Sequence, residues 1–555
     1  MKKLAYILST ALVSLTVASC NLDINQDPYA VTNLDVTQLL TCTEYEVGVT
    51  FGPGSYLNAN FSAYVHHTVS REIDNYSLIA SYSTLGNTWA QAYRYAIKNC
   101  DALIADGDEN GNAIYAGIGR VLRAYTYMYM VDLWGDIPYT EANVAGVETP
   151  KLDKSVDIYN DLLKSINDAI ANFKDQEAKN ALKPGANDLF YGGDVAKWIK
   201  CANTLKLKLL VQSRLAKSQI NGWANELSTL LAEDNFIGDG EDLQFPHSAA
   251  TTPSDERNQA WVDEYNGGQK TVYISPWFYE CMHGDTYNWK NNPFRSIVDP
   301  RIPYYFYNQV KAGANAVNKT DYRNGAFISI MFGSNSGYTS NTQEAAMTTL
   351  GIYPCGGLYD DGSAKTVGAK TGNGIAPDKM LQAYSVPFMK AELVLAGETT
   401  GDAKTLLANG IVASFKHVIA TSQASDSNTP SIGELPGNEF INAVLTRFDA
   451  ANAEGKMEIV MTQKWVANFF NPVEAYNDIR RTGYPVMFTG DAQNMAYSPY
   501  TQTVEAHEGL TAFNLVALLK YPRIMWYPQG ETQTNPNVSN EGRVVSEKAV
   551  FWDVK

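Results

Sequence analysis

The sequence predicts a mainly α-helical protein built from helical hairpins, with one long loop-rich insertion. Apolar residues recur every three or four positions in several segments, which is typical of amphipathic helices. Short glycine-containing turns join neighbouring segments, as in a tetratricopeptide-like scaffold, although no strict repeat of about 34 residues is present. Helical periodicity is lost between about residues 235 and 380. We therefore expect one domain over residues 20–555, with its insertion at about 235–380.

A removable leader is predicted at residues 1–19. Lys2 and Lys3 form a basic start, an apolar stretch of about 14 residues follows, and small residues precede Cys20. The stretch is shorter than the roughly 20 residues that a membrane-spanning helix needs. Residues 17–20 also fit a lipobox, so we expect cleavage before Cys20 and lipidation of that cysteine. The alternative is an ordinary secretory signal followed by a chance cysteine.

Four helices are expected in the first half of the chain. Their apolar stripes lie at Trp89–Ile104, Ile114–Tyr129, Ser155–Phe173 and about 194–216. A polar turn at 106–111 separates the first two, and Gly135 ends the second. Ser155 is a suitable N-cap for the third helix.

Three more helices are expected in the second half of the chain. They lie near residues 391–395, 403–415 and 457–470. A glycine-bounded hinge at 397–401 separates the first two. Short connections of this kind again favour stacked helical hairpins.

Charged residues on the helices are expected to satisfy one another rather than to bind a ligand. Arg120, Arg123 and Asp132 share one predicted helix and could pair across its turns. Arg480 and Arg481 lie near Asp478, where they could tie a helix end to a loop.

Composition excludes two classes of partner. The chain carries 43 Lys+Arg against 59 Asp+Glu, a formal net charge of −16, and no basic run offsets it locally. Such a surface repels phosphate backbones and anionic lipid headgroups, which argues against nucleic-acid binding and polybasic membrane docking. The cysteines after Cys20 are odd in number and have no CxxC spacing, so we expect buried free thiols.

No catalytic motif marks an active site. The chain contains no Walker A or HExxH sequence, and Asn335 occupies the nucleophile position of a GxSxG-like stretch at 333–337. A glycoside hydrolase needs two carboxylates about 5–10 Å apart. With 59 acidic residues, accidental pairs are unavoidable, so a surface glycoside hydrolase stays open as an alternative.

Two metal patterns carry little weight. Asp106, Asp108 and Asn110 match the first ligand positions of a calcium loop, but glycine stands where the closing bidentate glutamate belongs. A polar turn that caps two helices is the alternative for this segment. His66 and His67 are adjacent and face different directions on a helix, so we expect a surface or core pair there.

Several blocks then carry a family resemblance. They are RVLRA at 120–124 with DLWGDIPY at 132–139, GDVAKWIKCANTLK at 193–206, DPR at 299–301, residues 391–397 with 410–414, QKW at 463–465 with RRTGYP at 480–485, and YPR at 521–523 with residues 527–531. In this order they resemble the SusD/RagB family of nutrient-binding lipoproteins from Bacteroidetes, in its SusD-like 2 branch. The blocks cover most of the chain after Cys20.

The resemblance implies a SusD-like helical scaffold with a ligand site on inserted loops and no enzymatic activity. It also implies a lipid-anchored outer-membrane protein that faces the cell exterior and works with a SusC-like TonB-dependent transporter. The expected ligand is an oligosaccharide, with an oligopeptide as the alternative. An adhesin or structural lipoprotein is a third class of function. No cofactor is expected beyond the weak calcium candidate.

Ligand contacts are expected in two zones of the chain. Aromatic rings stack on the C–H faces of sugars, while Asn, Asp and Arg bind their hydroxyl rims. The candidates are Arg71, Asn75, Tyr76, Tyr82, Trp261, Tyr265, Trp277, Trp289 and Tyr338. Core packing is the alternative for each aromatic residue, and we assign Trp89 and Trp198 to the core.

Overall fold

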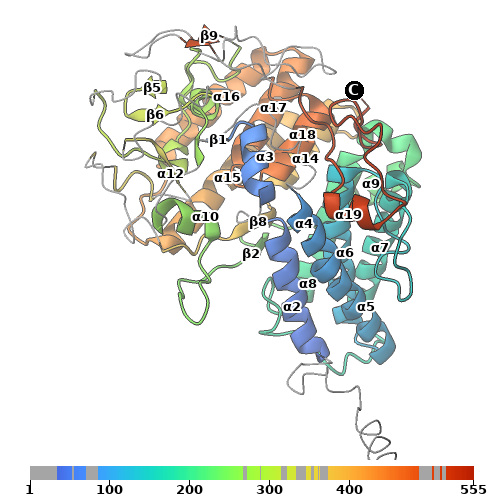
Figure 1. Ribbon diagram of the computed structural model, residues 1–555. Coiled ribbons are helices and arrows are strands. Elements are labelled where there is room, and N and C mark those ends of the chain that lie inside the picture. Colours follow the sequence, from blue (N-terminus) through green and yellow to red (C-terminus); the bar gives the residue numbers. More distant parts are fainter. Residues whose placement is uncertain are drawn as a thin grey trace, which may run out of the picture.

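The protein is described by a computed structural model (Figure 1). The described residues are 34–52, 56–70, 85–266, 272–287, 289, 291–313, 322–332, 346–351, 355–360, 362, 373–486, 503–504, 513–514 and 520–554. The predicted leader and Cys20 lie outside them. No described helix combines the length and the apolar character that crossing a membrane requires.

Helical hairpins form the first half of the chain, coloured blue to teal in Figure 1. The helices are α2 (Val36–Thr50), α3 (Tyr56–Tyr64), α4 (Gly86–Gln91), the π-helical η3 (Ala92–Ile97), α5 (Lys98–Asn110), α6 (Ala113–Trp134), α7 (Ser155–Lys174), α8 (Val195–Gln212), the 3-10 helix η4 (Arg214–Gln219) and α9 (Trp223–Glu233). Helix α6 packs on both α5 and α7, and α7 packs on α8. The mainly helical, hairpin-based fold predicted from the sequence is therefore confirmed.

A second helical group follows the insertion and is coloured yellow to orange. It contains α14 (Ser385–Leu395), α15 (Ala403–Ser425), α16 (Glu434–Ala450), α17 (Ala453–Ala467) and α18 (Pro472–Thr482), and the short α19 (Gln529–Thr534) lies nearer the C-terminus. Helix α14 packs on α15, α17 and α8, so it connects the two groups. One large cluster of buried apolar side chains runs through both groups.

The insertion contains short elements between longer loops. They are β2 (Leu243–Phe245), α10 (Gln259–Trp261), the π-helical η5 (Val262–Asn266), β3 (Val272–Ile274), α11 (Pro276–His283), α12 (Ile302–Tyr305), β4 (Phe306–Tyr307), β5 (Tyr322–Asn324), β6 (Phe327–Ser329), β7 (Thr349–Leu350) and β8 (Asp378–Leu381). Pairing of β2 with β8 brings the two ends of the insertion together. The insertion contacts α8 through β8, whereas α10, α12, β5 and β6 lie on the opposite side of the view from α5 and α7 (Figure 1).

The remaining sheets are also small antiparallel pairs. Strand β3 pairs with β1 (Thr68–Ser70), β4 pairs with β7, β5 pairs with β6, and β9 (Thr503–Val504) pairs with β10 (Phe513–Asn514). The β1–β3 pair links the segment after α3 to the insertion. These two-stranded sheets therefore hold loop segments together and do not form a sheet layer of the fold.

Helix boundaries differ from the prediction where tertiary contacts replace local signals. Helix α5 does not stop at Asp106 but continues to Asn110, where Gly111 adopts a φ of +70°. Ser155 begins α7 but does not cap it by its side chain, because the Asp136 carboxylate accepts a hydrogen bond from the Ser155 amide at 2.8 Å. Helix α8 ends at Gln212, and α14 and α15 are longer than their apolar stripes.

Several helices had no strong signal in the sequence. The helices α2, α9, α11, α16 and α18 were not predicted. In α18, all of the residues are buried although the segment includes two acidic and two basic residues. Periodicity of apolar residues cannot find a helix whose buried face is charged.

Candidate functional site

Two aromatic candidates of the insertion lie in the protein core. Trp277 is 2% exposed and Trp289 is 0% exposed. The Trp277 ring lies 4.3 Å from the His66 ring, and the Trp289 ring packs edge-on against Trp465 at 6.2 Å. In this conformation neither ring presents a face to a ligand. The structure therefore agrees with core packing, the alternative that the sequence left open for these two residues.

Trp261 and Tyr265 make contacts between different segments of the insertion. Their rings lie 5.9 Å apart, and they are 4% and 6% exposed. The Arg257 guanidinium lies over the Trp261 ring, and the Tyr265 hydroxyl donates a hydrogen bond of 2.7 Å to the Leu350 carbonyl. These contacts are those of packing residues. The candidates Arg71, Asn75, Tyr76, Tyr82 and Tyr338 lie outside the described residues.

The weak calcium candidates lie on a helix rather than in a loop. Asp106, Asp108 and Asn110 belong to the last turns of α5, and the Asp108 carboxylate forms an ion pair with Arg120 at 2.6 Å. Across the described part of the chain, no three His, Cys, Asp or Glu side chains form a group that could hold a metal ion. His66 and His67 are both fully buried, which agrees with the core alternative, but they follow the end of α3 rather than lie on a helix.

The charged residues of α6 pair with neighbouring helices, which corrects the expectation of pairing along the helix. Arg123 contacts Asp101 of α5 at 2.6 Å. Asp132 accepts hydrogen bonds from Tyr159 of α7, Asn477 of α18 and Trp552 near the C-terminus. These side chains therefore join different elements.

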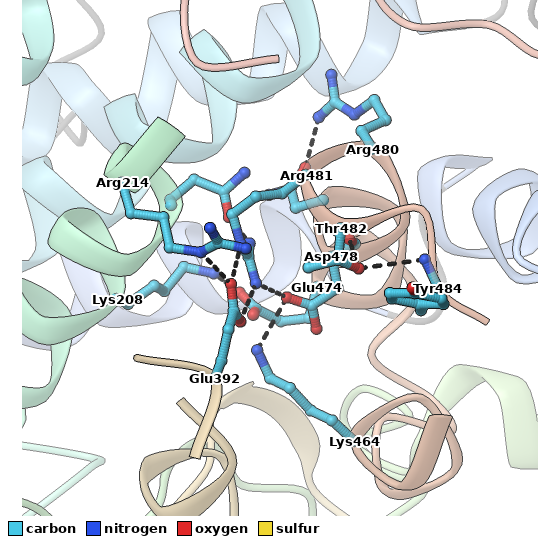
Figure 2. Close-up of polar contacts among 12 residues, drawn as sticks. Lys208, Arg214, Glu392, Lys464, Glu474, Asp478, Arg480, Arg481, Thr482 and Tyr484 are labelled. Carbon is cyan, nitrogen blue, oxygen red and sulfur yellow. Dashed lines mark hydrogen bonds and ion pairs between the residues drawn. The ribbon is translucent and has the colours of Figure 1, made fainter. Parts of the chain in front are cut away.

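A largely buried charge cluster lies where the two helical groups meet (Figure 2). Glu392 of α14 is 0% exposed and accepts hydrogen bonds from Arg481 at 2.7 and 2.8 Å and from Arg214 at 2.7 Å. Burial alone would raise the pKa of Glu392, but the attraction of Arg481 and Arg214 outweighs it and holds this pKa well below 4.5. Glu392 is therefore a buried, compensated anion.

The cluster continues into α17 and α18. Asp478 accepts hydrogen bonds from Arg481 at 2.6 Å and from Lys464 at 2.9 Å, and Lys208 of α8 pairs with Glu474. Arg480 extends it by donating a hydrogen bond of 2.7 Å to the Arg523 carbonyl. Of the three residues predicted to tie a helix end to a loop, only Arg480 does so, whereas Arg481 and Asp478 join α18 to other helices. Because these charged groups are buried and held by ion pairs and hydrogen bonds within the protein, they are architectural.

The DPR block has the same structural character. Arg301 is fully buried and forms hydrogen bonds with Asp299 at 2.5 and 2.9 Å. Its other donors reach Ser414 of α15 at 2.9 Å and Gln463 of α17 at 2.8 Å. Arg301 therefore fixes the insertion to the second helical group.

Two histidine–aspartate pairs lie at the base of the insertion and border a cavity of about 370 Å³. Nδ1 of His417 lies 3.1 Å from Asp242 Oδ2, and Nε2 of His247 lies 3.1 Å from Asp378 Oδ1. Nδ1 of His247 also faces the Glu256 carbonyl at 3.0 Å. Both nitrogens of His247 thus face acceptors, an arrangement that suits the imidazolium form.

The two histidines titrate in opposite directions. Burial by itself would lower the pKa of His247, but the Asp378 carboxylate, 3.1 Å from Nε2, outweighs burial and raises the pKa above 6.5. Burial lowers the pKa of His417 below 6.5, and Asp242 offsets only part of that effect. The two imidazoles at the cavity therefore shift in opposite directions, His247 toward its charged form and His417 toward its neutral form.

Sequence reasoning missed this cavity because its parts are far apart in the chain. Asp242 and His417 are 175 positions apart, and no motif connects them. Only the pairing of β2 with β8 and the packing of α15 bring them together. The polar residues beside β2 and β8, at the two ends of the insertion, are the sequence feature that could have indicated this cavity.

Comparison with known proteins identifies related sequences and folds. The SusD-like 2 family model, described as "Starch-binding associating with outer membrane", matches residues 28–502. No curated protein matches the chain significantly.

Solved structures share the fold over nearly the whole chain. A chitin-binding protein has 18% identity and a TM-score of 0.66, with 94% of this chain and 100% of that chain covered. A SusD/RagB family protein from Bacteroides thetaiotaomicron has 19% identity and a TM-score of 0.67, with coverages of 94% and 99%. A SusD homolog from Bacteroides fragilis has 17% identity and a TM-score of 0.62, with coverages of 94% and 100%.

Proposed function

The chain belongs to the SusD-like family of starch-binding proteins that associate with the outer membrane, and from this premise we propose that it is a non-enzymatic nutrient-binding lipoprotein that captures oligosaccharides at the cell surface. The observation that carries the proposal is the family match over residues 28–502. The fold agrees with it, because solved SusD-like chains superpose on 94% of this chain. A binding role also suits a described structure whose buried charges are already compensated.

The proposed anchor is an acylated Cys20. Its support is the basic start, the apolar stretch and the Val17–Cys20 lipobox. A Cys20→Ala variant should no longer be acylated and should leave the membrane fraction. Recovery of this variant in the outer membrane at the wild-type level would contradict the proposed anchor.

The proposed partner is a SusC-like TonB-dependent transporter that imports the captured ligand. Family membership supports this role, since the family is described by its association with the outer membrane. The test is co-purification of the acylated chain from native membranes. Recovery of a transporter barrel supports the partnership, whereas its absence favours the adhesin or structural class.

An oligosaccharide is the preferred ligand class, and an oligopeptide is the alternative. The family description names starch, and a similar solved structure is described as chitin-binding. We propose that the loop segments with Arg71, Asn75, Tyr76, Tyr82 and Tyr338 contribute to binding.

The deciding experiment is a binding screen of the chain from Asn21 onward. Tryptophan fluorescence should report saturable binding of members of a glycan panel and no response to a peptide panel. The opposite result would assign peptides instead. Release of shorter sugars during the assay, lost on replacing one acidic residue, would favour the glycoside hydrolase.

A further inference from the structure

The cavity at the base of the insertion is built from three distant parts of the chain. One wall comes from residues 239–247 around β2, a second from residues 375–377 before β8, and a third from α15. Its volume of about 370 Å³ falls in the range of small-molecule sites, roughly 300–1,000 Å³. Of the predicted ligand residues, the four that the structure describes, Trp261, Tyr265, Trp277 and Trp289, do not line it.

One face of α15 supplies an apolar wall with small side chains. Ala413, Ala420 and Ala424 follow one another at helical spacing along the cavity. Pro246 and Pro377 complete this surface from the two ends of the insertion. Small and rigid side chains leave room for a ring and offer it a flat apolar contact.

Polar groups from β2 and from α15 itself face the same space. Gln244 lines the cavity, and its buried Oε1 has no hydrogen-bond partner. Asp242 is held in place by the Ala383 amide at 2.6 Å and by His417 at 3.1 Å. Thr421 adds a hydroxyl from α15. A buried acceptor without a partner is destabilising, so a ligand hydroxyl that donates to Gln244 Oε1 would bind favourably.

Charge balance around the cavity disfavours an ionic ligand. Lys416 pairs with Asp239 at 2.6 Å, and His247 pairs with Asp378 at 3.1 Å. Asp242 remains as a negative group beside a neutral imidazole, which opposes anions. A metal ion would need a group of three ligand side chains, which the described residues do not form.

We propose that this cavity is a second ligand site that takes a small neutral polyhydroxylated molecule, of monosaccharide to disaccharide size. Hydroxyl groups would donate to Gln244 and Asp242, and the C–H face of the ring would rest on the alanine wall of α15. The choice of a saccharide among neutral polyols rests on the proposed function. The location and chemistry of the site rest on the cavity itself.

The test places a reporter at the cavity. Ala424 is exposed and lines the cavity, so Ala424→Cys can carry an environment-sensitive fluorophore. Cys42 is the least buried of the five described cysteines and is replaced by serine to keep the labelling specific. The matched control is Val412→Cys, which is 37% exposed on the same helix and does not line the cavity. Maltose and N,N′-diacetylchitobiose are the probes.

We expect a saturable change at Ala424→Cys with at least one disaccharide and no change at Val412→Cys. Adding Gln244→Leu should raise the half-saturation concentration at least fivefold without lowering Tm, because Gln244 Oε1 has no protein partner to lose. An unchanged half-saturation, or equal responses at both positions, would overturn the proposal.

The two sites can fail separately. If tryptophan fluorescence reports oligosaccharide binding while the Ala424→Cys reporter stays silent, the cavity proposal is overturned and the proposed function stands. If the reporter responds while the glycan panel gives no tryptophan signal, the cavity is supported and the main glycan site is not. An equal response of the reporter to a dipeptide would overturn the assignment to polyols.

Discussion

Glu392 has no exposed surface, yet two arginines keep it ionised. A buried ion loses its hydration, and this loss is repaid only if its partners remain in place. Removing one partner is therefore far more damaging than removing an exposed ion pair. The same reasoning applies to Asp478, which depends on Arg481 and Lys464.

Arg481→Met should lower the free energy of unfolding by about 3–5 kcal/mol, because it leaves Glu392 with one arginine and Asp478 with one lysine. Urea unfolding followed by circular dichroism measures the change. The control is Lys404→Ala, which breaks an exposed pair with Asp449 and should leave stability unchanged. Equal effects of the two variants would contradict an essential role for the cluster.

His247 and His417 should give stability opposite dependences on pH. The raised pKa of His247 contributes stability that is fully present below pH 6.5 and is lost as pH rises through the higher folded value. The lowered pKa of His417 has the reverse effect, since stability from the neutral ring is present above pH 6.5 and is lost as pH falls.

The measurement is urea unfolding of each variant from about pH 5 to pH 8.5, around the ordinary histidine pKa. His247→Gln should lose most stability, relative to wild type, at the acidic end. The stability of His417→Gln should increase relative to that of the wild type as pH falls. If the free energy of unfolding of the two variants depended on pH in the same way, the two histidine–aspartate pairs would not control the pH dependence of stability.

At the scale of elements, close approach of helices decides which residues are allowed. A Cβ atom added to Gly107 of α5 would lie 2.7 Å from the Ala116 amide nitrogen of α6. A Cβ atom added to Gly410 of α15 would lie 2.8 Å from the Phe388 ring of α14. These two glycines therefore allow the paired helices to approach closely. Their role is in helix packing and not in forming a turn.

Gly107→Ala should destabilise the protein by about 1–3 kcal/mol, because backbone atoms must move to admit the methyl group. The control is Gly530→Ala in α19, where no atom lies within 4 Å of the new Cβ. That change should stabilise by about 0.5–1 kcal/mol through helix propensity. Thermal unfolding of both variants gives the comparison, and a stabilised Gly107→Ala would disprove the close packing of α5 on α6.

At the scale of the whole molecule, the end of the chain closes the first helical group. Trp552 is fully buried and its Nε1 donates a hydrogen bond of 2.9 Å to Asp132 of α6. Arg523 pairs with Asp553 at 2.6 Å and so fixes the same segment. Residues more than 400 positions apart thus share one core, as the 420-position separation of Asp132 and Trp552 shows.

Trp552→Ala should reduce the free energy of unfolding by about 3–5 kcal/mol, as expected of a large buried side chain. Trp552→Phe keeps a six-membered aromatic ring but loses the five-membered part of the indole and the hydrogen bond to Asp132, so its loss should be smaller than that of the alanine variant, about 1–3 kcal/mol. Differential scanning calorimetry should show one transition in each case. A separate low-temperature transition would mean that the terminal segment unfolds on its own.

The sequence by itself determined the fold class, the family and the loop-rich insertion, because helical periodicity and ordered blocks are local properties of the chain. It placed α6 and α7 well, since their apolar stripes are continuous. It could not place α18, whose buried face is ionic.

Only the tertiary structure decided what the singled-out residues do. Trp277 and Trp289 belong to the core, and Arg123 pairs with another helix. The cavity between β2, β8 and α15 also exists only in the fold. Burial and ion pairing depend on which distant segments meet, and no short stretch of sequence contains that information.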